Sequence, residues 1–365
     1  MLEEYFSKIV INDEFSSQQI GSTVDRYENE FPRLDGKSIA LFGLTEDGVG
    51  NAVRQEFYKL MSSARLINEL VDLGDISEQE STLKTNEAIS SVIHHLLEKG
   101  IVPVFVALNL ECGEPIYQAF QSCKKQVEFS LISHKLPIAD YEMLNRICTS
   151  TPNYLTNINS LAFQAQYISP KSLDVFENLN FGHYRLGSIK TNKEDAELYL
   201  RNAGITLFDI NSIKHCDAPG KHIIQPSGLT SEEACQLSRY AGMSELGKCF
   251  VVSGLAPSKD QEKLTATLCS HLIWYYLDGY FSRCSDLPGE HKDFIKYRCD
   301  FSDDQVPILF LKSKKTERWW MQIEHPAEPS DINKQITFPC SYMDYQIAAN
   351  GETPQRYLDS LKGLA

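Results

Sequence analysis

The sequence predicts an α/β protein built around a mainly parallel β-sheet. Short runs of β-branched and apolar residues recur along the chain, as at Ser38–Gly43, Ile101–Asn109 and Ile205–Ile210. Continuous apolar runs of this length are typical of strands buried on both faces, as the strands of parallel sheets are. Segments with apolar residues at helical spacing separate these runs, and Asn86–Lys99 is the strongest example. A chain of 365 residues is long enough to bury one large core of this kind.

The overall charge of the chain indicates which classes of binding partner are disfavoured. Charged residues make up 23% of the chain and hydrophobic ones 42%, which is ordinary for a folded protein. The formal net charge of −14 disfavours nucleic acid and anionic membrane surfaces, because both are polyanions. No window holds the run of about 18 apolar residues that spans a bilayer. We therefore expect neither a nucleic-acid nor a membrane partner.

The cysteines and the N-terminus indicate a reducing compartment. The ten cysteines are scattered, without a Cys-x-x-Cys pair or a Cys/His cluster at zinc spacing. Several lie in apolar runs, where a reduced, buried thiol is expected. The first residues, MLEEYFSKIVINDEF, carry acids where a secretory signal carries Lys or Arg. The predicted location is the cytoplasm.

The chain divides into three predicted parts. Residues 1–35 are expected to form an irregular, acidic lead-in, residues 36–285 the α/β domain, and residues 286–365 a small, more polar C-terminal extension packed on that domain. In chain order, the predicted strands are 38–43, 70–76, 101–109, 127–131, a β-rich segment at 152–169, 183–187, 205–210, 249–253 and 306–311. The predicted helices are one containing Val53, Phe57 and Leu60, then 86–99, 170–180, 193–203, 230–240, 263–281 and a terminal helix capped by Ser341.

The candidate functional site follows the strand Ile205–Ile210. Asp209 and Asn211 emerge two residues apart, and therefore on one side, at its carboxyl end. Parallel sheets place functional groups at the carboxyl ends of their strands. An Ala-Pro-Gly turn at 218–220 and a Gly-Leu-Thr at 228–230 follow shortly afterwards. This stretch is the predicted location of a site.

These motifs resemble the signature of the ureohydrolases, the family of arginase, agmatinase and formimidoylglutamase. Asp47, Gly48 and Arg54 match the opening loop and helix of that family, and LVDLGDI at 70–76 matches its Asp-x-Gly-Asp strand end. The PNYL, DAPG, EEACQ, RYAGMS and RWWM segments resemble a formimidoylglutamase-like subgroup of the Bacteroidetes. The resemblance implies a three-layer α/β/α arginase-like fold. It also implies hydrolysis of guanidino or formimino C–N bonds by two manganese ions.

The residues that would hold those ions are mostly replaced. Carried across position by position, the six manganese ligands of the family fall on Leu110, Ile132, His134, Leu136, Asp209 and Asn211. Gly254 stands where the family has the glutamate that meets the cationic substrate. Two adjacent divalent ions need several carboxylates, and a single aspartate does not supply them. We therefore expect no bound cofactor.

Two alternatives remain for the metal. One ion could be retained by His134, Asp209 and the Asn211 carbonyl oxygen, the first two being the vestigial ligands. The alignment could also be shifted by one or two residues, so that Asn109, Glu111 or Ser133 supplies a donor. A shift of that size does not restore two metal sites.

Three functions follow from this pattern. The leading prediction is a non-catalytic binding or assembly protein that has lost the dimanganese centre and the C–N hydrolase activity. The alternative is an active formimidoylglutamase-like hydrolase of linear amidines with an atypical manganese site. The third is a converted enzyme that uses Cys112, His134 or His215 as new catalytic groups.

The expected partners are a small-molecule ligand in the old pocket and further copies of the chain. The basic KSKK at 312–315 lies beside Trp319 and Trp320. In an acidic chain this pattern favours a hairpin turn with packed or interface tryptophans over a nucleic-acid contact. By analogy with the family, we expect a homo-oligomer.

Overall fold

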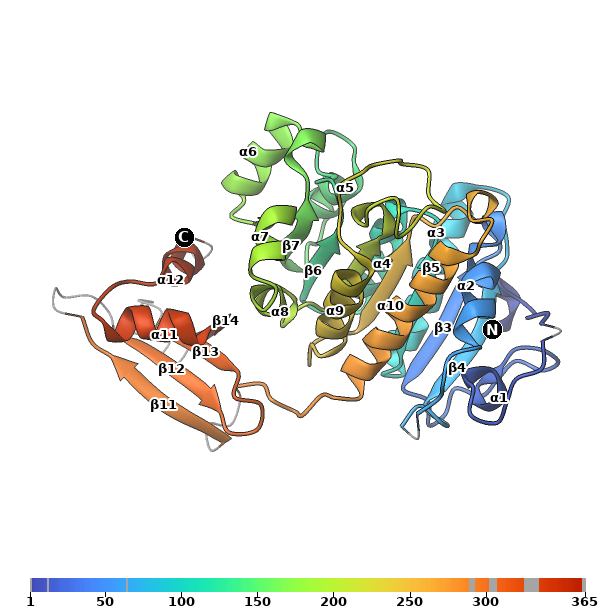
Figure 1. Ribbon diagram of the computed structural model, residues 1–365, viewed down its shortest axis with the longest axis horizontal. Coiled ribbons are helices and arrows are strands. Elements are labelled where there is room, and N and C mark those ends of the chain that lie inside the picture. The colour runs from blue at the N-terminus through green and yellow to red at the C-terminus, as the bar shows by residue number, and fades with distance from the viewer. Residues whose placement is uncertain are drawn as a thin grey trace. The chain divides into compact units, whose positions relative to one another are not determined.

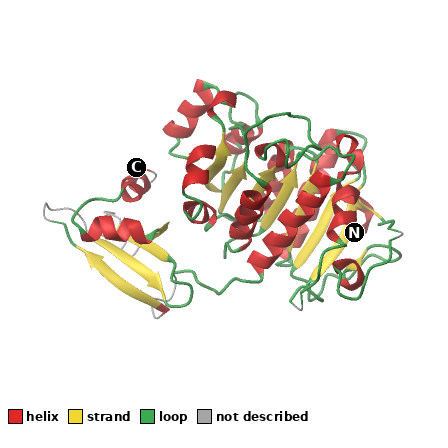
Figure 2. Ribbon diagram, viewed as in Figure 1, coloured by secondary structure: helices red, strands yellow, loops and turns green. Residues whose placement is uncertain are grey.

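The computed structural model describes residues 2–11, 13–63, 65–288, 293–301, 307–324 and 335–362. The chain forms two compact units, one of residues 1–176 and 181–282, the other of residues 177–180 and 283–365. Each unit has its own β-sheet (Figures 1 and 2). The candidate site belongs to the first unit.

The first unit is organised around a sheet of ten strands in the order β1-β4-β3-β5-β10-β9-β6-β7-β8, with β2 also paired to β4. All pairings are parallel except that of β1 with β4. The strands are β1 Phe6–Ser7, β2 Asp25–Arg26, β3 Ile39–Leu44, β4 Leu70–Ile76, β5 Val102–Ala107, β6 Val127–Ile132, β7 Leu155–Phe163, β8 Gly182–Arg185, β9 Ile205–Asp209 and β10 Cys249–Ser253. Strands β3, β4, β5, β9 and β10 are buried throughout, as their continuous apolar sequences predict.

Helices cover both faces of this sheet and complete a three-layer α/β/α arrangement (Figure 1). They are α1 Ile20–Thr23, α2 Val49–Phe57, α3 Thr82–Glu98, α4 Gly113–Ser122, α5 Met143–Thr149, α6 Pro170–Asn178, α7 Leu186–Thr191, α8 Asp195–Leu200, α9 Ser231–Gly242 and α10 Leu264–Tyr280. Helices α2, α9 and α10 pack together, and α3 packs on α4. Right-handed crossovers place these two groups on opposite faces, because the connections through α3 and α4 run across the sheet in the opposite direction to those through α2 and α9.

Several local predictions are confirmed by the helix ends. The capping box at the start of α9 is present, with the Thr230 side chain and that of Glu233 each bonded to the other's backbone N–H. Helix α3 begins earlier than predicted, because Ser81 caps it through the backbone N–H of Lys84. The β-rich segment at 152–169 contains β7, as expected.

The N-terminal lead-in is more regular than predicted. Phe6 pairs with Ile76 in β1, and Asp25 pairs with Val71 in β2, so this segment extends the sheet beyond β4. Each of these strands has only two residues. A strand of that length carries no detectable alternation of apolar and polar residues, which is why sequence reasoning missed both.

The second unit contains a four-stranded antiparallel sheet, β11-β12-β13-β14, followed by two helices. Its elements are β11 Phe294–Cys299, β12 Ile308–Ser313, β13 Trp319–Glu324, β14 Gln335–Cys340, α11 Tyr342–Ala349 and α12 Gln355–Lys362. The start of the strand predicted at 306–311 lies outside the described residues. Ser341 caps α11, as predicted.

The tryptophans of the second unit are packing residues. The basic segment 314–318 is the turn between β12 and β13, and both Trp319 and Trp320 are buried. Trp319 stacks on Tyr297 and Tyr345, and Trp320 meets Phe294 edge to face. The predicted hairpin with packed tryptophans is therefore confirmed.

None of the helices within the described ranges combines the length and hydrophobicity that crossing a bilayer requires.

Candidate functional site

The predicted site lies at the carboxyl edge of the central strands. Asp209 is the last residue of β9 and pairs in register with Ser253, the last residue of β10. On its other side, Phe208 pairs with Ile132, which ends β6, so that Ser133 and His134 follow directly at the same edge. This register brings Asp209, His134 and Asn211 together, as the sequence predicts.

Both carboxylate oxygens of Asp209 are occupied by hydrogen-bond donors of the protein. Oδ1 accepts from the backbone N–H and from Nδ2 of Asn211, at 2.9 and 2.8 Å. Oδ2 accepts from the Ser133 hydroxyl at 2.9 Å and lies 3.3 Å from Nδ1 of His134. Asp209 is 1% exposed and His134 4%. The carboxylate is thus enclosed and hydrogen-bonded on all sides by its neighbours.

These contacts keep Asp209 ionised. Burial alone would raise its pKa, but hydrogen bonding and charge from His134, followed by the bonds from Asn211 and Ser133, outweigh burial. The pKa of Asp209 therefore lies below the usual value for an aspartate. Asn211 is held in turn by Gln225, whose Nε2 donates to the Asn211 carbonyl oxygen.

Gly254 has no room for a side chain. Its φ is +93°, a conformation that favours glycine, and it follows β10 directly. A Cβ atom at this position would lie 2.9 Å from both Asn211 Nδ2 and Asp209 Oδ1. The place that belongs to a substrate-binding glutamate in the resemblance is therefore closed by the Asp209–Asn211 contact.

Three of the substituted positions belong to the hydrophobic core. Leu110, Ile132 and Leu136 are all buried and pack in the main core cluster. Ile132 ends β6, and Leu110 begins a short 3₁₀ helix after β5. These side chains contribute packing at the edge of the site and offer no lone pair to a metal ion.

The residues present do not fit a dimanganese centre. Among the described residues, no group of three or more His, Cys, Asp or Glu side chains is arranged to hold a metal ion. Asp209 already accepts from Ser133, His134 and Asn211, so a cation would have to displace some of these donors. The Asn211 Oδ1 atom is buried without a hydrogen-bond partner, but an uncharged amide oxygen is a weak ligand for a hard divalent ion.

Lys221, which sequence reasoning missed, is buried in the loop that follows Asp209. It follows the Ala218–Gly220 turn, and its side chain is 1% exposed. Its ammonium donates a hydrogen bond to the carbonyl oxygen of Ile213. A lysine in a loop is ordinarily solvated, so its residue type alone gave no signal. The only indication in the sequence that Lys221 is buried was its position directly after the Ala-Pro-Gly turn.

The cysteine proposed as a new nucleophile is not placed for catalysis. Burial raises the pKa of the Cys112 thiol well above its ordinary value, and the negative charges of Glu111 and Asp209 act in the same direction. No hydrogen bond joins Cys112 to a histidine in the described part of the chain. His215 has a buried Nδ1 atom without a partner. Within the described ranges, neither Cys112 nor His215 is therefore part of a Cys–His pair.

The opening motif of the resemblance forms a buried ion cluster. Arg54 of α2 donates from Nε to Asp72 at 2.8 Å and from both terminal nitrogens to Asp75, at 2.9 and 2.7 Å. The Tyr58 hydroxyl donates to Asp72 at 2.9 Å. This cluster attaches α2 to β4 and accounts for the Arg and Asp-x-Gly-Asp residues in structural terms.

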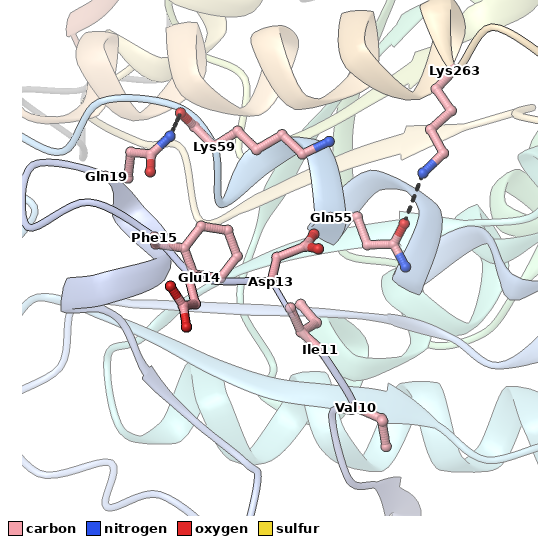
Figure 3. A pocket seen from close by; sticks show the side chains of 9 residues that line it. All are labelled: Val10, Ile11, Asp13, Glu14, Phe15, Gln19, Gln55, Lys59 and Lys263. Carbon is pink, nitrogen blue, oxygen red and sulfur yellow. Dashed lines mark hydrogen bonds between the residues drawn. The ribbon is translucent and has the colours of Figure 1, made fainter.

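A cavity of about 480 Å³ is lined by residues of the N-terminal segment and by neighbouring helix residues (Figure 3). Asp13 and Glu14 of the N-terminal segment line it together with Lys59 and Lys263. Lys263 donates to Gln55 at 3.1 Å, and Lys59 is paired with Glu56. The predicted site residues are not among those that line this cavity.

Comparisons with known proteins identify the fold. No protein-family model matches the sequence, and no curated protein matches it. Among solved structures, the formimidoylglutamase of Bacillus subtilis subsp. subtilis str. 168 is 17% identical, with a TM-score of 0.64 over 75% of this chain and 96% of that one. A formiminoglutamase of Trypanosoma cruzi, solved with Mn²⁺, is 17% identical, with a TM-score of 0.65 over 74% and 100%. The agmatine ureohydrolase of Thermoplasma volcanium is 16% identical, with a TM-score of 0.58 over 73% and 96%.

The first unit is therefore an α/β/α protein with its polar site at the carboxyl edge of a parallel sheet. More particularly, it has the arginase-like fold, which confirms the predicted fold class. Function is carried by the side chains of a site and not by the fold, so the activity requires a separate argument.

Proposed function

We propose that this chain is a ureohydrolase-type protein of the formimidoylglutamase-like Bacteroidetes subgroup that has lost the dimanganese centre and the C–N hydrolase activity. It acts instead as a non-catalytic binding or assembly protein in the cytoplasm. The observation that carries this proposal is the state of Asp209. Its two oxygens accept from Asn211 and Ser133 and contact His134, so that protein groups already engage the one carboxylate among the six carried-over positions.

The charge available at the site supports the same proposal. Hydrolysis by this family's chemistry needs hydroxide at neutral pH, and metal ions supply it by lowering the pKa of bound water from about 15.7 to about 7. Two divalent ions close together need several anionic ligands. The six positions carried over from the family contain one carboxylate, Asp209, and one imidazole, His134, with Leu110, Ile132 and Leu136 packed in the core.

The closed position at Gly254 also supports loss of substrate binding. A cationic amidine needs an anionic partner, and Gly254 provides none. A larger residue there would collide with Asp209 and Asn211. Nothing at this position recognises a guanidinium or formimino group.

An assay with manganese in excess tests the proposal. The protein is purified without chelator and incubated with Mn²⁺ and formiminoglutamate, arginine or agmatine, and formamide, urea and ammonia are measured. The formimidoylglutamase of Bacillus subtilis serves as the positive control. We expect no release above the buffer blank. Manganese-dependent release would establish the active, atypical hydrolase instead, and metal-independent release that stops on thiol alkylation would establish a cysteine enzyme.

The remaining role is binding or assembly. A small ligand near Asp209 and His134 and self-association of the chain are parts of this proposal. The second unit is the natural candidate for an assembly element, although its tryptophans are buried within its own core. Light scattering on the chain with and without residues 283–365 tests it, and an unchanged number of subunits removes the second unit from assembly.

A further inference from the structure

Helices α3 and α4 bring a cysteine and a histidine into contact. Cys123 follows α4 directly, and its backbone N–H donates to the carbonyl oxygen of Ala119 at 3.2 Å, which holds the residue at the helix end. His94 lies near the end of α3, which packs on α4. The Sγ atom of Cys123 is 3.2 Å from Nδ1 of His94. A thiol in contact with an imidazole is the arrangement in which a base can activate a sulfur nucleophile.

Glu98 orients the ring of His94. It lies one turn later on α3, and its Oε1 atom is 3.5 Å from Nε2 of His94. A carboxylate accepts hydrogen bonds and does not donate them, so it favours the tautomer that carries the proton on Nε2. Nδ1 then presents its lone pair to the thiol of Cys123. Thiol, imidazole and carboxylate therefore follow one another in the order of a nucleophile, its base and the group that positions the base.

The thiol of Cys123 is half-buried and needs a base. His94 is also half-buried, with 33% of its side chain exposed, so the pair is open to solvent on one side. Burial raises the pKa of the Cys123 thiol above its ordinary value, the positive charge of Lys125 lowers it, and Glu98 raises it. The resting group is consequently the thiol and not the thiolate. Its proton must be accepted during attack, and Nδ1 of His94 is in the position to accept it.

We propose that Cys123, His94 and Glu98 form a site of reversible thiol modification by low-molecular-weight disulfides. His94 accepts the thiol proton at Nδ1 while the sulfur attacks the disulfide. The S–S bond of the small molecule breaks, a new S–S bond to Cys123 forms, and the leaving thiolate takes the proton from the imidazolium. One disulfide is consumed and one is formed, so the exchange needs no further oxidant or reductant. Glu98 is a positioning residue, because it acts through His94.

Site-resolved exchange with oxidised glutathione tests the proposal. The full chain is incubated with this disulfide, and the mixed disulfide at each cysteine is followed over time by mass spectrometry of its peptides. We expect His94→Gln to slow the modification of Cys123 by about tenfold or more, because the general base is lost. Glu98→Gln should slow it roughly twofold to fivefold, as the loss of an exposed ion pair would. An unchanged Cys123 rate in His94→Gln overturns the proposal, and an unchanged rate in Glu98→Gln overturns the positioning role.

His95→Gln provides the matched control. His95 is the next residue of α3 and is likewise half-buried. Adjacent residues of a helix point about 100° apart, and the thiol of Cys123 contacts His94. The Cys123 rate is therefore expected to be the same in His95→Gln as in the unaltered protein. Equal slowing by both histidine substitutions would overturn the proposal.

Cys148 serves as the internal reference. It lies in α5, is half-buried like Cys123, and has no histidine in contact with its thiol within the described ranges. Burial raises the pKa of the Cys148 thiol to about 11. Its rate should be the same in all variants, and a slowing equal to that of Cys123 would overturn the proposal. In the unaltered protein Cys123 should be modified faster than Cys148, and equal rates at the two cysteines would overturn the proposal without the use of any variant.

Discussion

Nδ1 of His134 lies 3.3 Å from Oδ2 of Asp209, with both side chains buried at the carboxyl edge of the sheet. The backbone around His134 is fixed, because its carbonyl oxygen accepts from the N–H of Gln164 at 2.9 Å. The Tyr167 ring meets the imidazole edge to face at 5.5 Å. A residue that resembles a metal ligand is thereby held as a partner of the carboxylate.

The first prediction concerns Ser133, whose hydroxyl donates to Oδ2 of Asp209, the same oxygen that His134 contacts. Ser133→Ala removes a donor to a buried carboxylate and is expected to cost about 1–3 kcal/mol of folding free energy, measured by urea unfolding. Ser130, in the same strand region, has a buried Oγ without a partner. Ser130→Ala is therefore expected to be neutral or stabilising. Equal losses in both variants would contradict the assignment of the Ser133 bond.

Gly254 gives the second prediction. Gly254→Ala places a Cβ atom 2.9 Å from Asp209 Oδ1 at a positive φ, and we expect a loss of about 1–3 kcal/mol in urea unfolding. Gly187→Ala is the control, because a Cβ atom there meets no other atom within 4 Å and the residue lies in helix α7. It should be neutral or slightly stabilising. If Gly254→Ala left the free energy of unfolding unchanged, the Asp209 and Asn211 side chains would not be packed against Gly254 as the structure indicates.

Asn211 gives the third prediction. Asn211→Asp replaces the donor to Asp209 by a second carboxylate, so like charges then face one another. The melting temperature should fall by several degrees, and added Mn²⁺ should restore part of the loss, since a cation binds the folded state. Asn211→Ala, which adds no charge, should show no response to Mn²⁺. An equal response of the unaltered protein would show that the native site already binds the ion.

Several residues of this site could be predicted from the sequence, but the contacts that surround Asp209 could not. Asp209 and Asn211 were predictable, because a two-residue spacing at the end of an apolar strand places both side chains on one side. The occupation of Asp209 by Ser133, and the burial of Lys221, depend on contacts between segments far apart in the chain. Serine and lysine are usually solvated, so their residue types carry no signal for either contact.

The same distinction applies to the fold. The long apolar strands and the capped helices α9 and α11 were predictable from local patterns. The two-residue strands β1 and β2 were not, because their pairing with β4 is decided by tertiary contacts alone.

Glu128 gives a fourth prediction, at a distance from the predicted site. Burial raises its pKa from 4.5 to about 7, against hydrogen bonds from Asn157 and Asn159. The folded state therefore holds the proton more tightly, so the protein loses stability as the pH rises from about 4.5 through about 7. Glu128→Gln should remove this loss, which is on the order of 3 kcal/mol at pH 8 and under about 1 kcal/mol at pH 5. Urea unfolding at both pH values measures it.

The exposed Glu87 of α3 provides the control for this prediction. Glu87→Gln should give the same small change at both pH values, because its side chain is in solvent. A Glu128→Gln effect that is equal at pH 5 and pH 8 would contradict the proton-linked origin of the difference.

The most direct test of the central claim is a count of manganese ions on the unaltered protein. Electron paramagnetic resonance reports free Mn²⁺, and titration of the protein with the ion gives the number bound per chain. The account predicts that essentially all added Mn²⁺ stays free at concentrations that fill a dimanganese hydrolase. About two tightly bound ions per chain, lost on substitution of Asp209, would contradict it.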